Sequence, residues 1–263
     1  MKSIVKIGVT NLSFHHVAAS LVSNVLNSMG FDVQRIYSPH ETNFEKLKSG
    51  DVDLLASAWL PSSHGVYKAN VEEVISLTEL GLHYEPYALW GVPDYIPESA
   101  VSEVTDLLKP SVIEKMNANI QGINPGAGIT RFSIKMMEEY GLSNVGYKFH
   151  TGTEEDCFTA FEKQVEKEDW FVVPLWKPQF LHFKHKIREI KDPKGLLGVV
   201  DRAVLLIRDD KKQLLTKAQL NKLNALRFNN DVIAELDYHV SRNNKPLDDV
   251  TKAWLVSNEI IPA

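Results

Sequence analysis

Residues 4–37 read IVKIGVTNLSFHHVAASLVSNVLNSMGFDVQRIY, and this stretch decides the fold class. Apolar and polar side chains alternate over residues 4–9, which is typical of a strand. Apolar residues then recur at helical spacing from Val17 to Met29, and Gly30 predicts the end of that helix. Residues 31–37 are predicted to form the next strand. Because a strand–helix–strand unit favours parallel pairing, we expect an α/β protein.

The same alternation continues along the chain in two blocks. In the first block, a short helix near residues 44–48 is followed by an apolar run over residues 52–59, which indicates a strand covered on both faces. The second block comprises predicted strands at 120–123, 147–150 and 170–175 and predicted helices at 129–140 and 154–167. Two blocks of this kind predict two α/β lobes.

Two strands are predicted to cross between the lobes. Residues 82–93 form a predicted strand whose surrounding prolines suit a chain leaving one lobe for another. Residues 199–207 are long enough to cross back. We therefore expect a discontinuous lobe I, residues 1–92 and 201–263, and a lobe II, residues 93–200. Two lobes joined by two crossing segments predict a ligand cleft with hinge closure.

Composition excludes several classes of protein. The 263 residues carry a formal net charge of -5, without the clustered Lys and Arg that nucleic-acid binding needs. The longest apolar stretches are shorter than the roughly 20 residues that cross a bilayer. The N-terminus has no continuous apolar segment of the kind found in signal peptides, so either the signal was trimmed or the protein stays inside the cell. Gly122, Gly126 and Gly128 match no dinucleotide or P-loop motif, and we expect no cofactor.

Three of the five tryptophans stand at strand ends or beside prolines. Trp59 and Trp176 are each followed by a proline two residues on and then by a histidine, His64 or His182. Ligands gather at the carboxyl ends of strands in open α/β sheets, so we predict that Trp59, Trp176 and His64 bind a ligand. Trp90 lies inside a predicted crossing segment, and it is either a wall of the same site or a buried hinge residue.

The predicted ligand is a quaternary ammonium compound. Such a group has no proton to donate, and its diffuse charge is attracted by the faces of indole and phenol rings. A betaine also carries a carboxylate, and two helix N-termini offer backbone amides to it. Phe14 and His15 lie at the first of these. Gly128, Ile129 and Arg131 lie at the second.

Five stretches together resemble the substrate-binding proteins of glycine betaine and proline betaine ABC importers. They are SAWLPSSH at residues 57–64, GINPGAGI at 122–129, VVPLWKP at 172–178, DPKG at 192–195 and KPLDDVTKAWL at 245–255. They occur in the family's order and span nearly the whole chain.

The resemblance implies a type II periplasmic-binding fold, in which Trp59 and Trp176 wall an aromatic box and the loop of Phe14 and His15 meets the ligand carboxylate. It also implies a location outside the cytoplasm, periplasmic or lipid-anchored, with an ABC permease and ATPase as partners. We expect the protein itself to be a monomer. Two residues depart from the family pattern: Trp90 replaces a small aliphatic residue, and Gln179 a histidine. Glycine betaine, choline and carnitine therefore all stay open as ligands.

Two other functions were weighed from the residues. An enzyme on the same fold lacks a nucleophile, because Cys157 sits mid-helix behind acidic residues that should raise its pKa, and no nucleophile elbow is present. Metal binding by His182 with His185, or by His15 with His16, lacks a clustered carboxylate or cysteine, so a solvated surface is expected and no metal site. An intracellular sensor or regulatory binding module stays open as the alternative.

Overall fold

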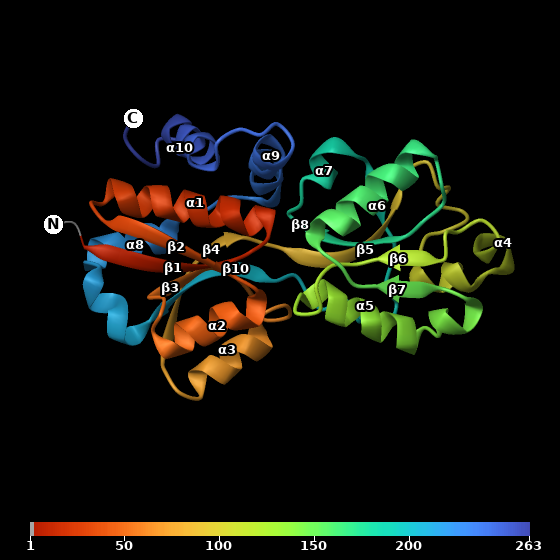
Figure 1. Ribbon diagram of the computed structural model, residues 1–263, viewed down its shortest axis with the longest axis horizontal. Coiled ribbons are helices and arrows are strands. Elements are labelled where there is room, and N and C mark those ends of the chain that lie inside the picture. Colours follow the sequence, from red (N-terminus) through yellow and green to blue (C-terminus); the bar gives the residue numbers. More distant parts are fainter. Residues whose placement is uncertain (1–2) are drawn as a thin grey trace. The chain divides into compact units, whose positions relative to one another are not determined.

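The computed structural model describes residues 3–263, which form two compact units. Unit 1 comprises Met1–Pro86 and Asp201–Ala263, and unit 2 comprises Tyr87–Val200 (Figure 1). The first division therefore lies at residue 86, six residues before the boundary expected from the sequence, and the second lies between residues 200 and 201. Among the described residues, no helix is long and apolar enough to cross a membrane.

Unit 1 is built on a five-stranded sheet in the order β2-β1-β3-β10-β4. The strands are β1 (Ile4–Thr10), β2 (Asp32–Ser38), β3 (Leu54–Leu60), β4 (Leu77–Tyr84) and β10 (Arg202–Arg208). β1 pairs in parallel with β2 and β3, as the alternating sequence pattern predicts. β10 pairs antiparallel with both β3 and β4. The chain returns to the sheet beside the end of β3, so β10 has to run backwards between its neighbours, and the sheet is mixed.

Helices cover both faces of this sheet (Figure 1). They are α1 (Ser13–Ser28), α2 (His40–Ser49), α3 (Gly65–Glu72), α8 (Lys217–Ala225), α9 (Asn230–Ser241) and α10 (Leu247–Ser257), with the short helix η3 (Asp209–Leu214) after β10. α1 contacts α9 and α10 on one face, whereas α2 and α3 pack together on the other. Phe44, Leu47, Val71 and the inner residues of β3 and β10 form a core beneath α2 and α3. Both faces of β3 are therefore buried.

Unit 2 contains two smaller sheets. An antiparallel sheet has the order β8-β5-β9, and a parallel pair joins β6 to β7. Its strands are β5 (Tyr87–Pro93), β6 (Asn119–Gln121), β7 (Lys148–His150), β8 (Val173–Lys177) and β9 (Ile187–Glu189). Its helices are η1 (Val104–Leu108), α4 (Pro110–Ile113), α5 (Gly128–Glu139), η2 (Leu142–Val145), α6 (Glu154–Glu166) and α7 (Leu181–Lys184).

The predicted strand over residues 82–93 is in fact two strands. β4 ends at Tyr84, and β5 begins at Tyr87 and pairs within unit 2. Pro86 has no amide hydrogen to donate to a sheet, and its carbonyl instead accepts a hydrogen bond from the amide of Asp201 at 2.7 Å. The two chain segments that pass between the units are thus bonded to each other at the edge of unit 1.

Candidate functional site

In unit 1, Trp59 is held at the carboxyl end of β3 by a hydrogen-bonded network. Its indole Nε1 donates to the Ser57 hydroxyl at 3.2 Å and to the Tyr84 hydroxyl at 3.1 Å. The Ser57 and Tyr84 hydroxyls are themselves 2.5 Å apart. Burial raises the pKa of Tyr84 to about 12, so the phenol keeps its proton at neutral pH. The network fixes the rotamer of a side chain that is only 6% exposed.

Further aromatic rings surround Trp59. Its ring centroid lies 5.1 Å from that of Phe14 and 5.2 Å from that of His15. Both residues lie in the first turn of α1, which begins at Ser13, and not in a loop before the helix as expected from the sequence. His64 stacks on the indole at 6.3 Å, and the Trp59 amide donates to His64 Nδ1 at 3.0 Å. The structure therefore brings together the four candidate residues predicted in this unit, Phe14, His15, Trp59 and His64.

The loop between Trp59 and His64 is anchored by Asp201. This buried carboxylate accepts hydrogen bonds from the Ser62 amide at 2.5 Å and from the Ser63 amide and hydroxyl at 3.0 and 2.6 Å. Asp201 is also the residue whose amide bonds to Pro86. The loop that positions Trp59 and His64 is thus tied to both chain segments that lead into unit 2.

The second predicted tryptophan, Trp176, occupies the end of β8 in unit 2. It lies opposite Ala88 of β5 and is 2% exposed. The Phe158 ring lies 6.1 Å from Trp176 and 4.8 Å from Phe180, so the indole belongs to an apolar cluster. Like Trp59, Trp176 comes shortly before a proline that follows a cis peptide bond.

Two polar side chains follow Trp176: Gln179, which is buried, and His182, which is half-buried. The Gln179 carbonyl oxygen accepts from the Leu181 amide at 2.6 Å, but its Nε2 has no hydrogen-bond partner among the described residues. The same is true of His182 Nε2. Burial is the main cause that lowers the pKa of His182 to about 4. His182 is therefore not a solvated surface histidine, and the surface interpretation made from the sequence is wrong for it.

Trp90 differs from the other two candidate tryptophans. It lies in β5, is fully buried, and donates from Nε1 to the Ser133 hydroxyl of α5 at 2.8 Å. These contacts favour the second of the two interpretations left open by the sequence, a buried hinge residue. Trp90 is therefore not part of the proposed ligand site.

The glycine-rich turn begins α5 as predicted, with Gly128 as its first residue and Ile129 buried behind it. The Arg131 guanidinium donates to the Gly126 carbonyl at 2.7 Å, which directs it back onto the turn. An arginine bonded to its own turn stiffens the loop that presents the helix amides. A contact between these residues and an anion stays a prediction.

The residues weighed for other chemistry are also placed. The Cys157 thiol is fully buried, and burial first, then Glu154 and Asp156, raises its pKa. His15 is buried rather than solvated, while His16 bonds to Asn11 through Nε2 at 3.0 Å. Neither His16 nor His185 joins a group of metal ligands among the described residues.

Comparison with known proteins identifies the family. The family OpuAC, described as the substrate binding domain of ABC-type glycine betaine transport systems, matches residues 3–257. The chain belongs to this family.

Solved structures show the same fold as this OpuAC-family chain. Lactococcal OpuAC, in its closed-liganded conformation complexed with glycine betaine, is 21% identical with a TM-score of 0.85, over 98% of this chain and 97% of that one. A glycine betaine, L-proline-binding protein (ProX) from Borrelia burgdorferi is 22% identical with a TM-score of 0.85, over 99% and 97% of the two chains. The predicted type II periplasmic-binding fold is confirmed.

A curated relative matches over a smaller part of the chain. The glycine betaine/carnitine transport binding protein GbuC of Listeria monocytogenes is 22% identical over 150 residues, which are 57% of this chain and 49% of GbuC. The match thus spans about half the length of this relative. The OpuAC family is a family of transporter substrate-binding domains and not of enzymes.

Three residues of the site were missed by sequence reasoning. Ser57 carried a signal, because positions 57 and 59 of a strand point to the same face. Tyr84 and Asp201 carried none, since each reaches β3 or its loop only through the pairing of β10 and β4.

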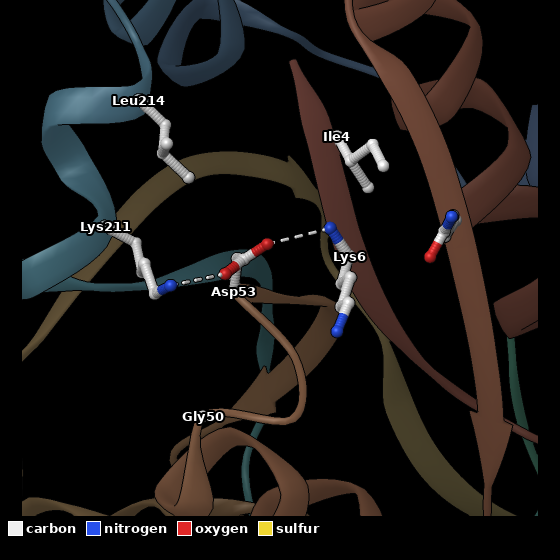
Figure 2. A pocket seen from close by; sticks show the side chains of 7 residues that line it. Ile4, Lys6, Gly50, Asp53, Lys211 and Leu214 are labelled. Carbon is white, nitrogen blue, oxygen red and sulfur yellow. Dashed lines mark hydrogen bonds and ion pairs between the residues drawn. The ribbon is translucent and has the colours of Figure 1, made fainter.

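A separate pocket of about 280 Å³ lies at the end of the unit 1 sheet where β1 and β3 begin, away from Trp59 at the carboxyl end of β3 (Figure 2). Asp53 lies at its centre, where its carboxylate forms an ion pair with the Lys211 ammonium at 3.2 Å and accepts a hydrogen bond from the backbone amide of Lys6 at 2.9 Å. Ligands of α/β sheets gather at the other end of the strands, so this pocket is not the candidate site.

Proposed function

We propose that this protein is the substrate-binding component of an ABC importer and that Trp59 and Trp176 both contact the ammonium group of a quaternary ammonium ligand. Membership of the OpuAC family carries this proposal. The ligand class is glycine betaine or a related betaine, choline or carnitine. Lactococcal OpuAC, which has the same fold, was solved with glycine betaine bound.

The surroundings of Trp59 support the choice of ligand. Phe14, His15 and His64 pack around the indole. Burial lowers the pKa of His15 and raises that of Tyr84, so both of these rings are neutral at pH 7. A desolvated aromatic face attracts a quaternary ammonium by about 2 kcal/mol. Two such faces would supply roughly half of the approximately 8 kcal/mol that micromolar affinity requires.

The carboxylate of a betaine would be met by backbone amides. The first turn of α1, with Phe14 and His15, and the start of α5, with Gly128, Ile129 and Arg131, are the two helix N-termini proposed for this contact. A preference for betaines over choline would support it.

As a transport component, the protein would act outside the cytoplasm and deliver its ligand to a permease driven by an ATPase. The family favours this over the sensor module that the sequence left open. The monomeric state stays a prediction.

The deciding experiment compares glycine betaine with 3,3-dimethylbutanoate, in which an uncharged carbon replaces the ammonium nitrogen, by isothermal titration calorimetry. Both have the same shape and a carboxylate, and they differ in the positive charge that the aromatic faces would attract. We expect the isostere to bind at least about 30-fold more weakly, which corresponds to the loss of one aromatic face of about 2 kcal/mol. Equal affinities would contradict the proposed aromatic box. If neither compound bound, the proposed ligand class would be wrong.

Variants of single tryptophans then show which rings produce the difference in affinity between the two ligands. Trp59→Leu and Trp176→Leu should each reduce the difference between the two ligands, because each removes one ring. Trp170→Leu is the matched control, since Trp170 pairs with Met116 and contacts the Lys115 ammonium. Circular dichroism of each variant separates lost binding from lost folding.

A further inference from the structure

Three buried histidines from different elements of unit 1 lie together. His15 is on α1, His40 begins α2, and His64 directly precedes α3. One ring nitrogen of each lies within 4.8 Å of those of the other two, and no side chain of the three is more than 4% exposed. This group could not be predicted from the sequence, because neighbouring members are more than 20 residues apart along the chain.

The spacing of the rings suits a metal ion. Their centroids are 6.3 Å apart for His15 and His40, 5.9 Å for His15 and His64, and 5.2 Å for His40 and His64. Tetrahedral Zn²⁺ with nitrogen ligands at about 2.0–2.1 Å places these nitrogens about 3.4 Å apart. Side-chain movements of about 1 Å would close the present spacing.

The protonation state and the outer contacts also suit a metal. All three rings are buried, and a buried imidazole favours the neutral form that binds a metal. His15 Nδ1 and the Ser57 hydroxyl are 2.9 Å apart. A hydrogen bond from one ring nitrogen commonly orients a histidine whose other nitrogen binds a metal.

We propose that His15, His40 and His64 form a site for a transition-metal ion of the zinc class, and that an ion there opposes binding of the quaternary ammonium ligand at Trp59. Imidazole nitrogens are the ligands that Zn²⁺ and its neighbours accept. The second half of this proposal rests on the proposed function; the first does not.

Two features make the metal and the ligand antagonistic. An ion on His15 and His64 would place positive charge behind Trp59, whose ring contacts both. The Trp59 amide also donates to His64 Nδ1. Coordination through His64 Nε2 needs the ring hydrogen on Nδ1, so two donors would then face each other and the Trp59 backbone would have to shift.

The test begins with the full chain, stripped with a chelator and titrated with Zn²⁺ by calorimetry in the absence of any ammonium compound. We expect one site. His40→Gln should weaken it by more than about 100-fold, since loss of an outer partner alone typically costs about 10–100-fold. His16→Gln, next to His15 on the same helix, is the matched control and should leave the affinity unchanged. Intense tetrahedral absorption with Co²⁺ should appear in the wild type and not in His40→Gln.

The second stage measures glycine betaine affinity with and without Zn²⁺. Occupancy by Zn²⁺ should weaken betaine binding by at least about tenfold in the wild type and in His16→Gln, but not in His40→Gln. Absence of Zn²⁺ binding, or equal loss in the two variants, overturns the metal site. Zn²⁺ binding without an effect on betaine overturns the antagonism. Failure of betaine binding in metal-free protein counts against the proposed function alone.

Discussion

The two candidate tryptophans are held by opposite kinds of surroundings. Around Trp59, the hydroxyls of Ser57 and Tyr84 accept from the indole, and His64 accepts from the backbone. At Trp176, the Phe158 ring packs beside the indole and itself packs on Phe180. Directional bonds thus hold the Trp59 indole, whereas packed aromatic rings surround the Trp176 indole.

This difference determines how each region should respond to change. Loss of packing volume leaves a cavity and costs several kcal/mol of stability. Loss of one hydrogen bond in a network costs less stability, but it frees the direction of the indole. Substitutions near Trp176 should therefore act mainly on unfolding, and those near Trp59 mainly on ligand binding.

The largest effect is expected for Phe158→Ala. Removal of this buried ring from the cluster of Trp176 and Phe180 should lower the free energy of unfolding by about 3–5 kcal/mol. Urea denaturation measures it. Phe183→Ala, at a phenylalanine that is 51% exposed, is the control and should cost far less. A loss below about 1 kcal/mol for Phe158→Ala would show that packing does not hold this region.

The next prediction uses pH, because the two regions contain one ionisable group each, Asp237 and His182, whose pKa values are shifted in opposite directions. Burial raises the pKa of Asp237, which accepts from the Ser13 hydroxyl beside Phe14, from 3.8 to about 6. The folded state therefore binds this proton more tightly, and its contribution to stability is lost as pH rises from about 4 to 6. Burial lowers the pKa of His182 near Trp176 from 6.5 to about 4, so its contribution is lost as pH falls over nearly the same range.

Each pKa shift changes the free energy of unfolding by about 3 kcal/mol at most between the pH limits given for that group. The measurement is the difference in unfolding free energy between wild type and Asp237→Asn, and between wild type and His182→Gln, from pH 4 to 7. The two difference curves should slope in opposite directions. Parallel curves would mean that one of the two groups is solvated rather than buried.

Much of unit 1 could be predicted because its information is local. The strand–helix–strand unit over residues 4–37 has its apolar spacing and its stop at Gly30 within one stretch of chain. The positions of Trp59 and Trp176 at strand ends were equally local, since a proline follows each. The two short strands on either side of Pro86 were predicted as one, because nothing local shows that their partners differ.

The contacts that complete the site are not local. His40 reaches His64 only when α2 and α3 pack together, and Asp201 reaches the loop after β3 only because the chain returns to this sheet. Sequence spacing indicates which residues share a face of one element. It does not show which elements become neighbours.

The smallest effect on stability, and the sharpest test of the comparison, is expected for Tyr84→Phe. The change removes one of the two hydroxyls that accept from the Trp59 indole and leaves Ser57 as the remaining acceptor. The unfolding free energy should fall by about 1 kcal/mol, the usual net value of one hydrogen bond. Betaine affinity should fall by at least about fivefold, because an indole free to turn no longer presents its face in advance. Tyr37→Phe, at an exposed tyrosine, is the control for both measurements. A variant that loses stability but keeps full affinity would show that packing by Phe14 and His15 alone orients Trp59, and the contrast with Trp176 would then disappear.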